Sequence, residues 1–432
     1  MTARRKDVAL PLSRRAFLTL LAAAPAALCL SHADEDFLED LSRRAFRMLW
    51  EQSDPSTGLT LDRARNDGSR EPRAANMASI AATGFALTGV CIAAERGWLP
   101  AAQAAGRVRT TLRAFDRKIE NHRGWFYHFL DASTGERFHD TELSSIDTAL
   151  LLAGVLTARQ YFHRDSEIPR LASAIYERVD FQWMLHNSPD MLSHGWKPES
   201  GFLPHRWDRI NEAVLLYALA IGSPKHPIPP RSWYSWERPV TTYDGIAFVS
   251  ASPLFTHQYP QAWLDLRGLR DGPPSNLNYF ENAIKATQAN RAFCIDLAKD
   301  FPKSYSPEIW GISASDGEKG YYAWGDPPQR DEVDGTLVPC APAGSLMFLP
   351  AGCLADLRHM KDRYGDRIWG RYGFVDAFNP TTGWVDADVL GIDQGITLLS
   401  AENMRSGFVW KHFMRNPEIR HALKLAGFRR AS

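Results

Sequence analysis

Three stretches of the sequence place acids among apolar or small residues, where a solvated carboxylate is not expected. The first, Glu142-Leu-Ser-Ser-Ile-Asp147-Thr-Ala-Leu-Leu-Leu, begins a strongly apolar run. A buried carboxylate is costly unless it is paired or hydrogen-bonded. Capping by Asp140 or Thr141, with Glu142 in the positive first turn of a helix, explains Glu142. It does not explain Asp147, which is therefore a candidate for chemistry.

The second stretch is Trp207-Asp-Arg-Ile-Asn-Glu-Ala-Val-Leu-Leu-Tyr217. Asp208 is predicted to cap a helix, and Glu212 is predicted to lie one turn inside that helix, where the sequence becomes wholly apolar. Burial raises the pKa of a carboxyl group, and a general acid needs a raised pKa near neutral pH. An ion pair of Glu212 with Arg206 or Arg209 is the alternative, and the local sequence leaves both open.

The third stretch, Val389-Leu-Gly-Ile-Asp-Gln-Gly395, opens another helix that is predicted to be buried. Asp393 either caps this helix or takes part in chemistry, and Gln394 offers both a donor and an acceptor. Several aromatic residues lie in Gly-rich, loop-like surroundings where their rings are expected to be exposed: Trp196, Trp207, Trp324, Trp369, Tyr372 and Trp384. An aromatic-lined cleft with several acids is typical of glycosidases, because sugar faces stack on rings while two carboxyl groups perform the hydrolysis.

The sequence contains no phosphate-binding G-x-x-x-x-G-K-S/T loop, no G-x-S-x-G nucleophile elbow and no H-E-x-x-H metal helix. Asp326, Asp331, Glu332 and Asp334 crowd one loop, but they lack the spacing of a calcium loop, so a solvated acidic loop is expected. No metal and no cofactor are predicted.

The composition is that of a globular protein with no electrostatic reason to bind nucleic acid. The 432 residues include 50 Lys and Arg and 50 Asp and Glu, so the formal net charge is zero. Nucleic-acid binders usually carry a clear basic excess. Hydrophobic residues make up 44% and charged residues 23%, which is ordinary for a folded chain and sufficient for a sizeable core.

The elements that must position the acids are predicted to be helices. Apolar residues recur at helical spacing from Phe37 to Trp50. Further helices are expected near 76–96, 100–120, 142–163, 166–185, 208–222, 256–268, 277–300, 344–363, 391–405 and 416–427. Strand signals are short, with Gly245–Val249 and Gly373–Ala377 as the best candidates, so the fold class is all-α.

One turn pattern recurs, at Asp54–Gly58, Asp131–Gly135 and Asn379–Gly383, with Asp or Asn first and Gly last. About eleven helices joined by turns and long loops, without Pro/Gly-rich linkers, predict one closed domain over residues 34–432. An α/α toroid is the natural candidate, because two rings of paired helices leave one open cleft lined by loops. An open solenoid would need a repeat of about 34–47 residues, which the sequence lacks.

Residues 1–33 are predicted to be a twin-arginine export signal. Ser13–Leu18 contains the paired arginines followed by Phe-Leu, and the apolar run Leu18–Leu30 is too short for a comfortable membrane span. Small residues at Ser31 and Ala33 make Asp34 the expected mature start, in the periplasm; a retained anchor is the alternative. The mature chain would carry 45 basic and 49 acidic residues, with no stable membrane insertion.

Four cysteines remain after residue 33: Cys91, Cys294, Cys340 and Cys353. They form no C-x-x-C pair and no metal-ligand spacing. Buried free thiols are favoured, and a disulfide, which the periplasm permits, is the alternative.

Seven motifs, in order along residues 36–427, resemble glycoside hydrolase family 144, which contains endo-β-1,2-glucanases. They are Ser79–Phe85, Glu142–Ala149, Trp207–Glu212, Phe255–Tyr259, Gly311–Gly317, Trp369–Asn379 and Gly391–Gly395. The resemblance implies a single (α/α)6 barrel and hydrolysis of β-1,2-glucan, often to sophorose, with inversion and without metal or cofactor.

The resemblance also implies roles for single residues. Glu212 would be the general acid and Asp393 the leading base, with Glu142 and Asp147 lining the subsites around the cleaved bond. In related enzymes, protons pass through substrate hydroxyls and water. The general acid and the general base therefore need not be two carboxyl groups that face each other across the cleaved bond. Substrate contacts are expected from Trp196, Trp207, His257, Gln258, Asp316, Trp324, Tyr372 and Gln394.

Two other hypotheses differ in class. One is an exo-acting or transglycosylating enzyme, and the other is a periplasmic glucan-binding protein without catalysis. The presence of all four acids argues against the binding protein, because binding alone does not require buried carboxylates. The oligomeric state is left open by the sequence.

Overall fold

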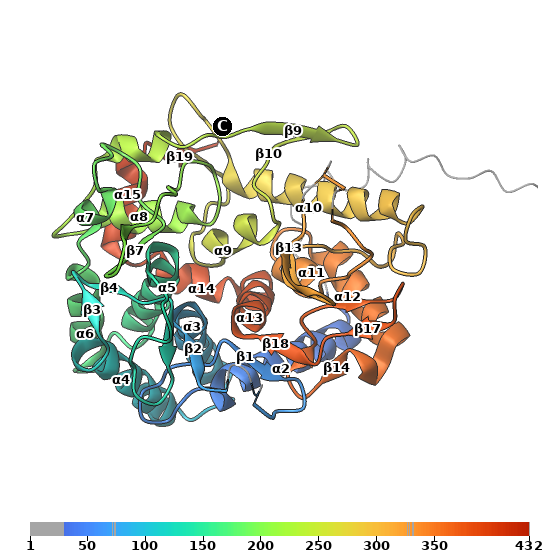
Figure 1. The fold of residues 1–432 in the computed structure, drawn as a ribbon, viewed down its shortest axis with the longest axis horizontal. Helices are drawn as coiled ribbons and strands as arrows, with labels where there is room; N and C mark the ends of the chain where they lie inside the picture. Colours follow the sequence, from blue (N-terminus) through green and yellow to red (C-terminus); the bar gives the residue numbers. More distant parts are fainter. Residues whose placement is uncertain are drawn as a thin grey trace, which may run out of the picture.

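The computed structural model describes residues 30–70, 72, 75–325, 327, 329–330 and 332–431, and the predicted twin-arginine motif lies outside this part of the chain. The described chain is rich in helices (Figure 1). They are α2 (His32–Glu51), α3 (Ile80–Glu95), α4 (Ala101–Arg117), α5 (Ser145–Tyr161), α6 (Ile168–Glu177), α7 (Phe181–Leu185), α8 (Ala213–Gly222), α9 (Phe255–Trp263), α10 (Tyr279–Leu297), α11 (Cys340–Gly344), α12 (Pro350–Tyr364), α13 (Gly391–Ser406), α14 (Phe408–Phe413) and α15 (Pro417–Leu425).

The predicted helices are confirmed, but one of them divides and some begin later than expected. The helix expected over 166–185 ends after α6, and Asp180 caps the separate α7 by accepting from the Trp183 N–H. Pro350 and Pro417 start α12 and α15, since proline fits the first turn of a helix but not its interior. The helix expected from residue 208 begins at Ala213.

Six helices form a closed cycle of neighbours within the described chain: α3, α5, α8, α9, α11 and α13, with α13 packing back on α3. Figure 1 shows α13 near the middle of the molecule, with α3, α5, α9 and α11 around it. Every residue of α8 is buried, whereas α2, α4, α6 and α15 bury one face. The amphipathic helices pack outside the cycle: α4 lies on α3, α6 lies on α5 and α15 lies on α8. A helix that is apolar all round belongs inside, and an amphipathic one outside.

Glycines set the closest crossing in the cycle, between α3 and α5. A Cβ on Gly154 would overlap the carbonyl oxygen of Gly84, and a Cβ on Gly84 would overlap the carbonyl oxygen of Leu150. The two backbones are therefore in direct contact, and no side chain fits between them.

Short antiparallel strands lie between the helices. They are β1 (Arg63–Arg65), β2 (Met77–Ser79), β3 (Asn121–His122), β4 (Trp125–Phe126), β5 (Phe129–Asp131), β6 (Leu143–Ser144), β7 (Gly195–Lys197), β8 (Gly201–Phe202), β9 (Val240–Tyr243), β10 (Ile246–Val249), β11 (Leu269–Arg270), β12 (Ala314–Gly317), β13 (Gly320–Ala323), β14 (Trp369–Gly370), β15 (Gly373–Phe374), β16 (Phe378–Asn379), β17 (Trp384–Val385), β18 (Asp388–Leu390) and β19 (Arg429–Arg430). The two strands predicted from sequence are present as β10, paired with β9, and the shorter β15, paired with β14.

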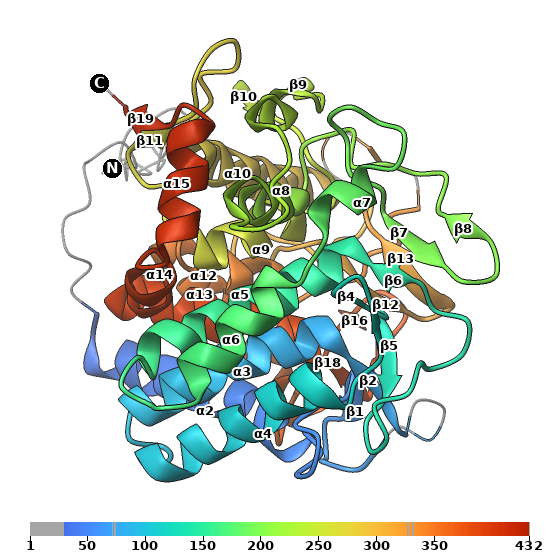
Figure 2. The same ribbon diagram turned by 90° about the vertical axis from the view of Figure 1, so that its left-hand side faces the viewer.

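Many of these strands gather at one end of the helices, toward the right of Figure 2. There β1 pairs with β18, β2 with β5, and β7 lies between β6 and β8. Three inner helices start directly after such a strand: α3 after β2, α5 after β6 and α13 after β18. The ladders therefore hold the N-terminal ends of these helices together.

The four cysteines are free and buried, as predicted. Among the residues that the structure describes, no helix combines the length and the apolarity needed to cross a membrane. The described chain starts at Leu30, and Ser31 caps α2, with its hydroxyl accepting from the Asp34 N–H. The first turn of α2 thus spans the predicted mature start at Asp34.

Candidate active site

The acids singled out in the sequence lie at the starts of three inner helices. Asp147 is in the first turn of α5, Glu212 directly precedes α8, and Asp393 is in the first turn of α13. Helix N-termini carry partial positive charge that favours negative groups. These three acids belong to one site, because a series of charged groups connects them and each group interacts electrostatically with the next. In order, the groups are Glu212, Asp147, His128, Asp62, Arg63, Asp316, Asp376 and Asp393.

Glu212 is a half-buried acid next to another acid. Burial, with the charge of Asp147 as a smaller cause, raises the pKa of Glu212 to about 7. It occupies the N-cap position of α8 instead of lying one turn inside, because the helix starts at Ala213. At pH 7 about half of the Glu212 carboxyl groups therefore keep their proton, and the protonated form is the state that a general acid requires.

The predicted ion-pair alternative for Glu212 is wrong, because both arginines are engaged elsewhere. Arg206 donates to the backbone carbonyls of Leu185, His186 and Met191. Arg209 pairs with Glu237 at 3.3 Å. Asp208, which was predicted to cap the helix, lies upstream of α8.

Asp147 is held by the residue that caps its own helix. Ser144, and not Asp140 or Thr141, caps α5: its hydroxyl accepts from the Asp147 N–H at 3.2 Å and donates to Asp147 Oδ2 at 2.5 Å. The Asp147 carboxyl is thus fixed in the first turn by a local hydrogen bond.

His128 lies between Asp147 and Glu142. Its Nδ1 is 3.0 Å from Glu142 Oε1, and its Nε2 is 3.5 Å from Asp147 Oδ2. Burial would lower the pKa of His128, but the charges of Asp147 and Glu142 outweigh it and raise the pKa to about 9. The hydrogen bond from His128, opposed by burial, lowers the pKa of Glu142. The result is a cation between two carboxylates.

Asp393 accepts several hydrogen bonds at the start of α13. The Tyr259 hydroxyl is 3.2 Å from Asp393 Oδ1, and the Cys340 thiol and the Asp376 carboxyl also bond to Asp393. Two carboxyl groups that share a hydrogen bond must hold a proton between them. Burial raises the pKa of both carboxyl groups, but the charge of Asp393 adds to the effect on Asp376, whereas accepted hydrogen bonds oppose it at Asp393. We therefore assign the proton to Asp376. Asp393 does not cap α13, whose N-cap is Leu390.

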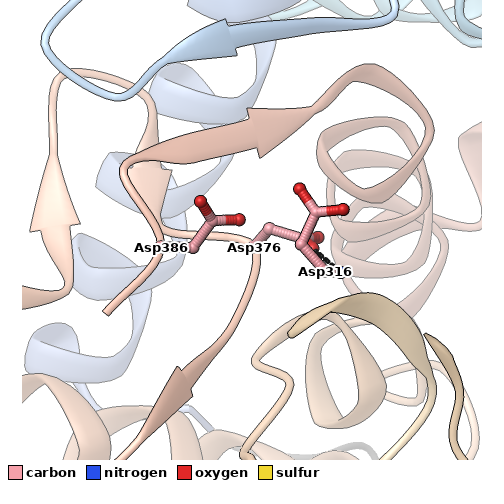
Figure 3. Close-up of side chains that lie close together, drawn as sticks. All are labelled: Asp316, Asp376 and Asp386. Carbon is pink, nitrogen blue, oxygen red and sulfur yellow. Dashed lines mark hydrogen bonds between the residues drawn. The ribbon is translucent and has the colours of Figure 1, made fainter. Parts of the chain in front are cut away.

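Asp316, Asp376 and Asp386 converge from separate segments, and one oxygen of each lies within 4.8 Å of the others (Figure 3). Arg63 donates to Asp316 at 2.7 Å. Burial, and then the charges of Asp316 and Asp388, raises the pKa of Asp386 to about 7. Protons and a guanidinium thus balance much of the negative charge of this cluster, and its carboxyl groups are partners suited to sugar hydroxyls.

Burial overturns the prediction of exposed rings for Trp207, Trp324, Trp369 and Tyr372. The indole N–H of Trp207 donates to Ser145 Oγ at 2.8 Å, and that of Trp324 donates to Ser315 Oγ at 2.9 Å. A buried indole needs such a partner, and the loops supply one inside the protein. Trp207 therefore supports the start of α5 from within.

The remaining predicted contacts differ in accessibility. Trp196 is half-buried and stacks on His122, with ring centroids 4.9 Å apart. Burial lowers the pKa of His257 to about 4, so its buried ring is neutral at neutral pH. Gln258 is fully buried and donates to the Ala341 carbonyl and to Ser345 Oγ, so it links α9 to α11 and does not line an open cleft.

Gln394 is buried beside Asp393, and its amide donates to the Phe374 carbonyl at 3.3 Å. Gln394, Asp376 and Asp393 border an internal cavity of about 10 Å³. This space is too small for a sugar ring, so a saccharide has to meet the more exposed members of the site.

Sequence reasoning missed Tyr321 and His128. Tyr321 on β13 is 56% exposed, yet burial of its hydroxyl end and the charges of Asp393 and Asp376 raise its pKa, which places that end at the acids. Tyr321 lies on a hairpin and His128 lies between two short strands, and neither segment is long enough to produce a periodic signal. Glu332 and Asp334 of the predicted acidic loop are exposed and half-buried, respectively, and Asp326 and Asp331 lie outside the described residues.

The geometry defines an acid-rich site on a helical scaffold, and comparisons with known proteins agree. A family model described as "Putative glucoamylase" matches residues 204–417. A putative glucoamylase of Bacteroides uniformis is 30% identical in its crystal structure, with a TM-score of 0.85 over 93% of this chain and 98% of that one. The chain belongs to this glycoamylase-like family, as the resemblance to glycoside hydrolase family 144 implied.

Two further relatives carry described activities. The endo-β-1,2-glucanase of Chitinophaga pinensis, solved with sophorotriose and glucose, is 27% identical, with a TM-score of 0.86 over 93% of this chain and 99% of that one. The exo-β-1,2-glucooligosaccharide sophorohydrolase of Parabacteroides distasonis is 28% identical over 90% of this chain. The chain spans 58% of the length of this curated relative.

Proposed function

We propose that this protein is a glycoside hydrolase that cleaves β-1,2-glucan with inversion and releases sophorose or short β-1,2-glucooligosaccharides. The observation that carries the proposal is Glu212, a half-buried residue beside Asp147 whose carboxyl pKa is raised to about 7. The activities described for the C. pinensis and P. distasonis relatives indicate the substrate.

The proposed scaffold is a single (α/α)6 barrel. The closed cycle from α3 through α13 would be its inner ring, and α2, α4, α6, α10, α12 and α15, each packed on an inner helix, would contribute to the outer ring. In this arrangement the strand-rich end, with the starts of α5, α8 and α13, forms the cleft.

In the proposed reaction, Glu212 donates its proton to the glycosidic oxygen as the bond to the anomeric carbon breaks. A water molecule attacks that carbon from the opposite face and gives up a proton. Asp393, joined to Asp376 by a shared proton, is the leading acceptor, reached through substrate hydroxyls or water. Glu142 and Asp147 bind the sugar hydroxyls on either side of the cleaved bond.

An exo-acting enzyme is the second candidate, because the P. distasonis relative is described as exo-acting and the C. pinensis relative as endo-acting. The time course of product lengths separates the two. Early appearance of many chain lengths indicates endo action, whereas disaccharide released from the first time point indicates exo action. Glucan binding without any cleavage would instead indicate a non-catalytic binding protein.

The proposed location is the periplasm, after export through the twin-arginine route directed by Ser13–Leu18. A substrate of this route folds before transport, so its thiols are buried early. Four buried free cysteines are compatible with that order of events.

A further inference from the structure

His128 is anchored on both sides by the backbone of the site. The backbone N–H of His128 donates to the backbone carbonyl of Glu142 at 2.9 Å. The backbone carbonyl of His128 accepts from the N–H of Ile80, the first residue of α3. Its ring lies parallel to that of Phe129, with centroids 3.9 Å apart. The imidazole therefore has a fixed position between α3 and α5.

Both ring nitrogens face carboxylate oxygens, Nδ1 toward Glu142 at 3.0 Å and Nε2 toward Asp147 at 3.5 Å. A neutral imidazole has one N–H, so its other nitrogen would point a lone pair at a carboxylate. The doubly protonated ring donates to both. The geometry alone thus selects the imidazolium, and the raised pKa of His128 agrees with it.

We propose that His128 is a positioning residue of this active site, whose imidazolium orients Glu142 and Asp147 toward the substrate and keeps Glu142 ionised. This inference rests on the proposed function. The ring is separated from the reacting atoms by the two carboxylates, so its effect passes through them.

The surrounding charges decide the direction of the effect. They are Glu142 and Asp147 on the α5 side, Asp62 and Arg63 around the start of β1, Lys197 on β7, His194 before β7, and Glu212 directly before α8, which interacts with Asp147. A nearby opposite charge lowers a carboxyl pKa by about 1–3 units. Loss of the imidazolium therefore raises the pKa of Glu142, which then needs a higher pH to ionise.

The test compares His128→Gln, which keeps a donor but no charge, with His128→Lys, which keeps the charge. His186→Gln is the matched control, because His186 also stacks on a phenylalanine, Phe202, and pairs with no carboxylate in the described chain. We expect His128→Gln to lose about 10²-fold in kcat, as for a misplaced catalytic group. In the pH profile of kcat/KM on linear β-1,2-glucan, we expect the acidic limb of the His128→Gln variant to move up by about 1–2 pH units. His128→Lys should restore part of that shift, and His186→Gln should show none.

An unchanged pH profile in active His128→Gln, or the same shift in His186→Gln, would overturn the proposal. Nitrogen chemical shifts of the His128 ring in the wild-type protein provide a measurement that does not depend on activity or on a variant that folds. Two protonated ring nitrogens at pH 7.5 are expected, and a neutral tautomer would contradict the proposal. An inactive wild-type protein with a protonated His128 would contradict the proposed function and leave the imidazolium intact.

Discussion

The Tyr259 hydroxyl lies 3.2 Å from Asp393 Oδ1 and connects the middle of α9 to the first turn of α13. A phenol at neutral pH donates, and a carboxylate accepts a stronger hydrogen bond than a neutral carboxyl group does, so this contact favours the ionised form of Asp393. The proton that the pair shares is therefore assigned to Asp376. The buried pair is therefore asymmetric, with one acid and one base in fixed positions.

Asp376→Asn should keep the fold, because the amide N–H can replace the acid proton in donating to Asp393. Asp376 has a folded-state pKa raised above its unfolded value, so its stabilising contribution is present at low pH and lost as the pH rises through the folded pKa. The asparagine does not titrate, and the variant should lose less stability than the wild type as the pH rises. Thermal unfolding over a series of pH values measures this, and an identical loss in the two proteins would refute the asymmetric pair.

Glu212→Gln should lose about 10²–10⁴-fold in kcat, the usual contribution of general acid catalysis. Glutamine keeps the shape and hydrogen-bonding capacity of the side chain, so binding of sophorose should largely survive. Turnover and calorimetric binding on one preparation test this. A fully active variant would show that Glu212 is structural.

The stability of the same variant has a defined pH dependence. Burial raises the pKa of Glu212 to about 7, so the wild type loses stability as the pH rises from the unfolded pKa near 4.5 to about 7. Glu212→Gln avoids this loss, and its melting temperature relative to the wild type should increase between pH 5 and pH 8. A lost ion pair would give the opposite trend.

The contact between α3 and α5 can be tested on stability alone. Gly154→Ala places a Cβ against the backbone of Gly84, where nothing can rotate away, so unfolding free energy should fall by about 1–3 kcal/mol. Gly106→Ala on α4 is the control: a Cβ there meets nothing within 4 Å, and the variant should gain about 0.5–1 kcal/mol. Equal effects of the two substitutions in denaturant unfolding would contradict the close crossing.

The inner helices and two of the key acids could be predicted because their signals are local. The apolar run after Asp147 and the one after Glu212 each fill a buried helix, and an acid at the start of such a run is conspicuous. Asp376 gives a similar signal, since it lies between Val375 and Ala377, but the segment is too short to identify as part of a site.

The rest of the site depends on contacts that the sequence does not encode locally. His128 is brought to the starts of α3 and α5 by a loop between two short strands, and Tyr321 meets Asp393 through a hairpin. Ladders of two to four residues have no usable periodicity. The burial of Trp207 and Trp324 has a related cause, because their N–H groups find the hydroxyl groups of Ser145 and Ser315 inside the protein.

Export makes a separate prediction that the described part of the chain does not test. Replacing Arg14 and Arg15 together by lysine should leave the precursor in the cytoplasm, because the paired arginines carry the proposed signal. Fractionation followed by N-terminal sequencing of periplasmic protein should show Asp34 as the first residue in the wild type. Normal export of the double variant would refute the twin-arginine route.

The central claim concerns the substrate, and the distribution of products from linear β-1,2-glucan over time tests it most directly. The mature protein should shorten this glucan to sophorose or short β-1,2-glucooligosaccharides, with the new reducing ends formed in the inverted configuration, and Glu212→Gln should not. Starch, cellulose and laminarin should remain intact. Release of glucose from starch at a comparable rate, with β-1,2-glucan left uncleaved, would contradict the account.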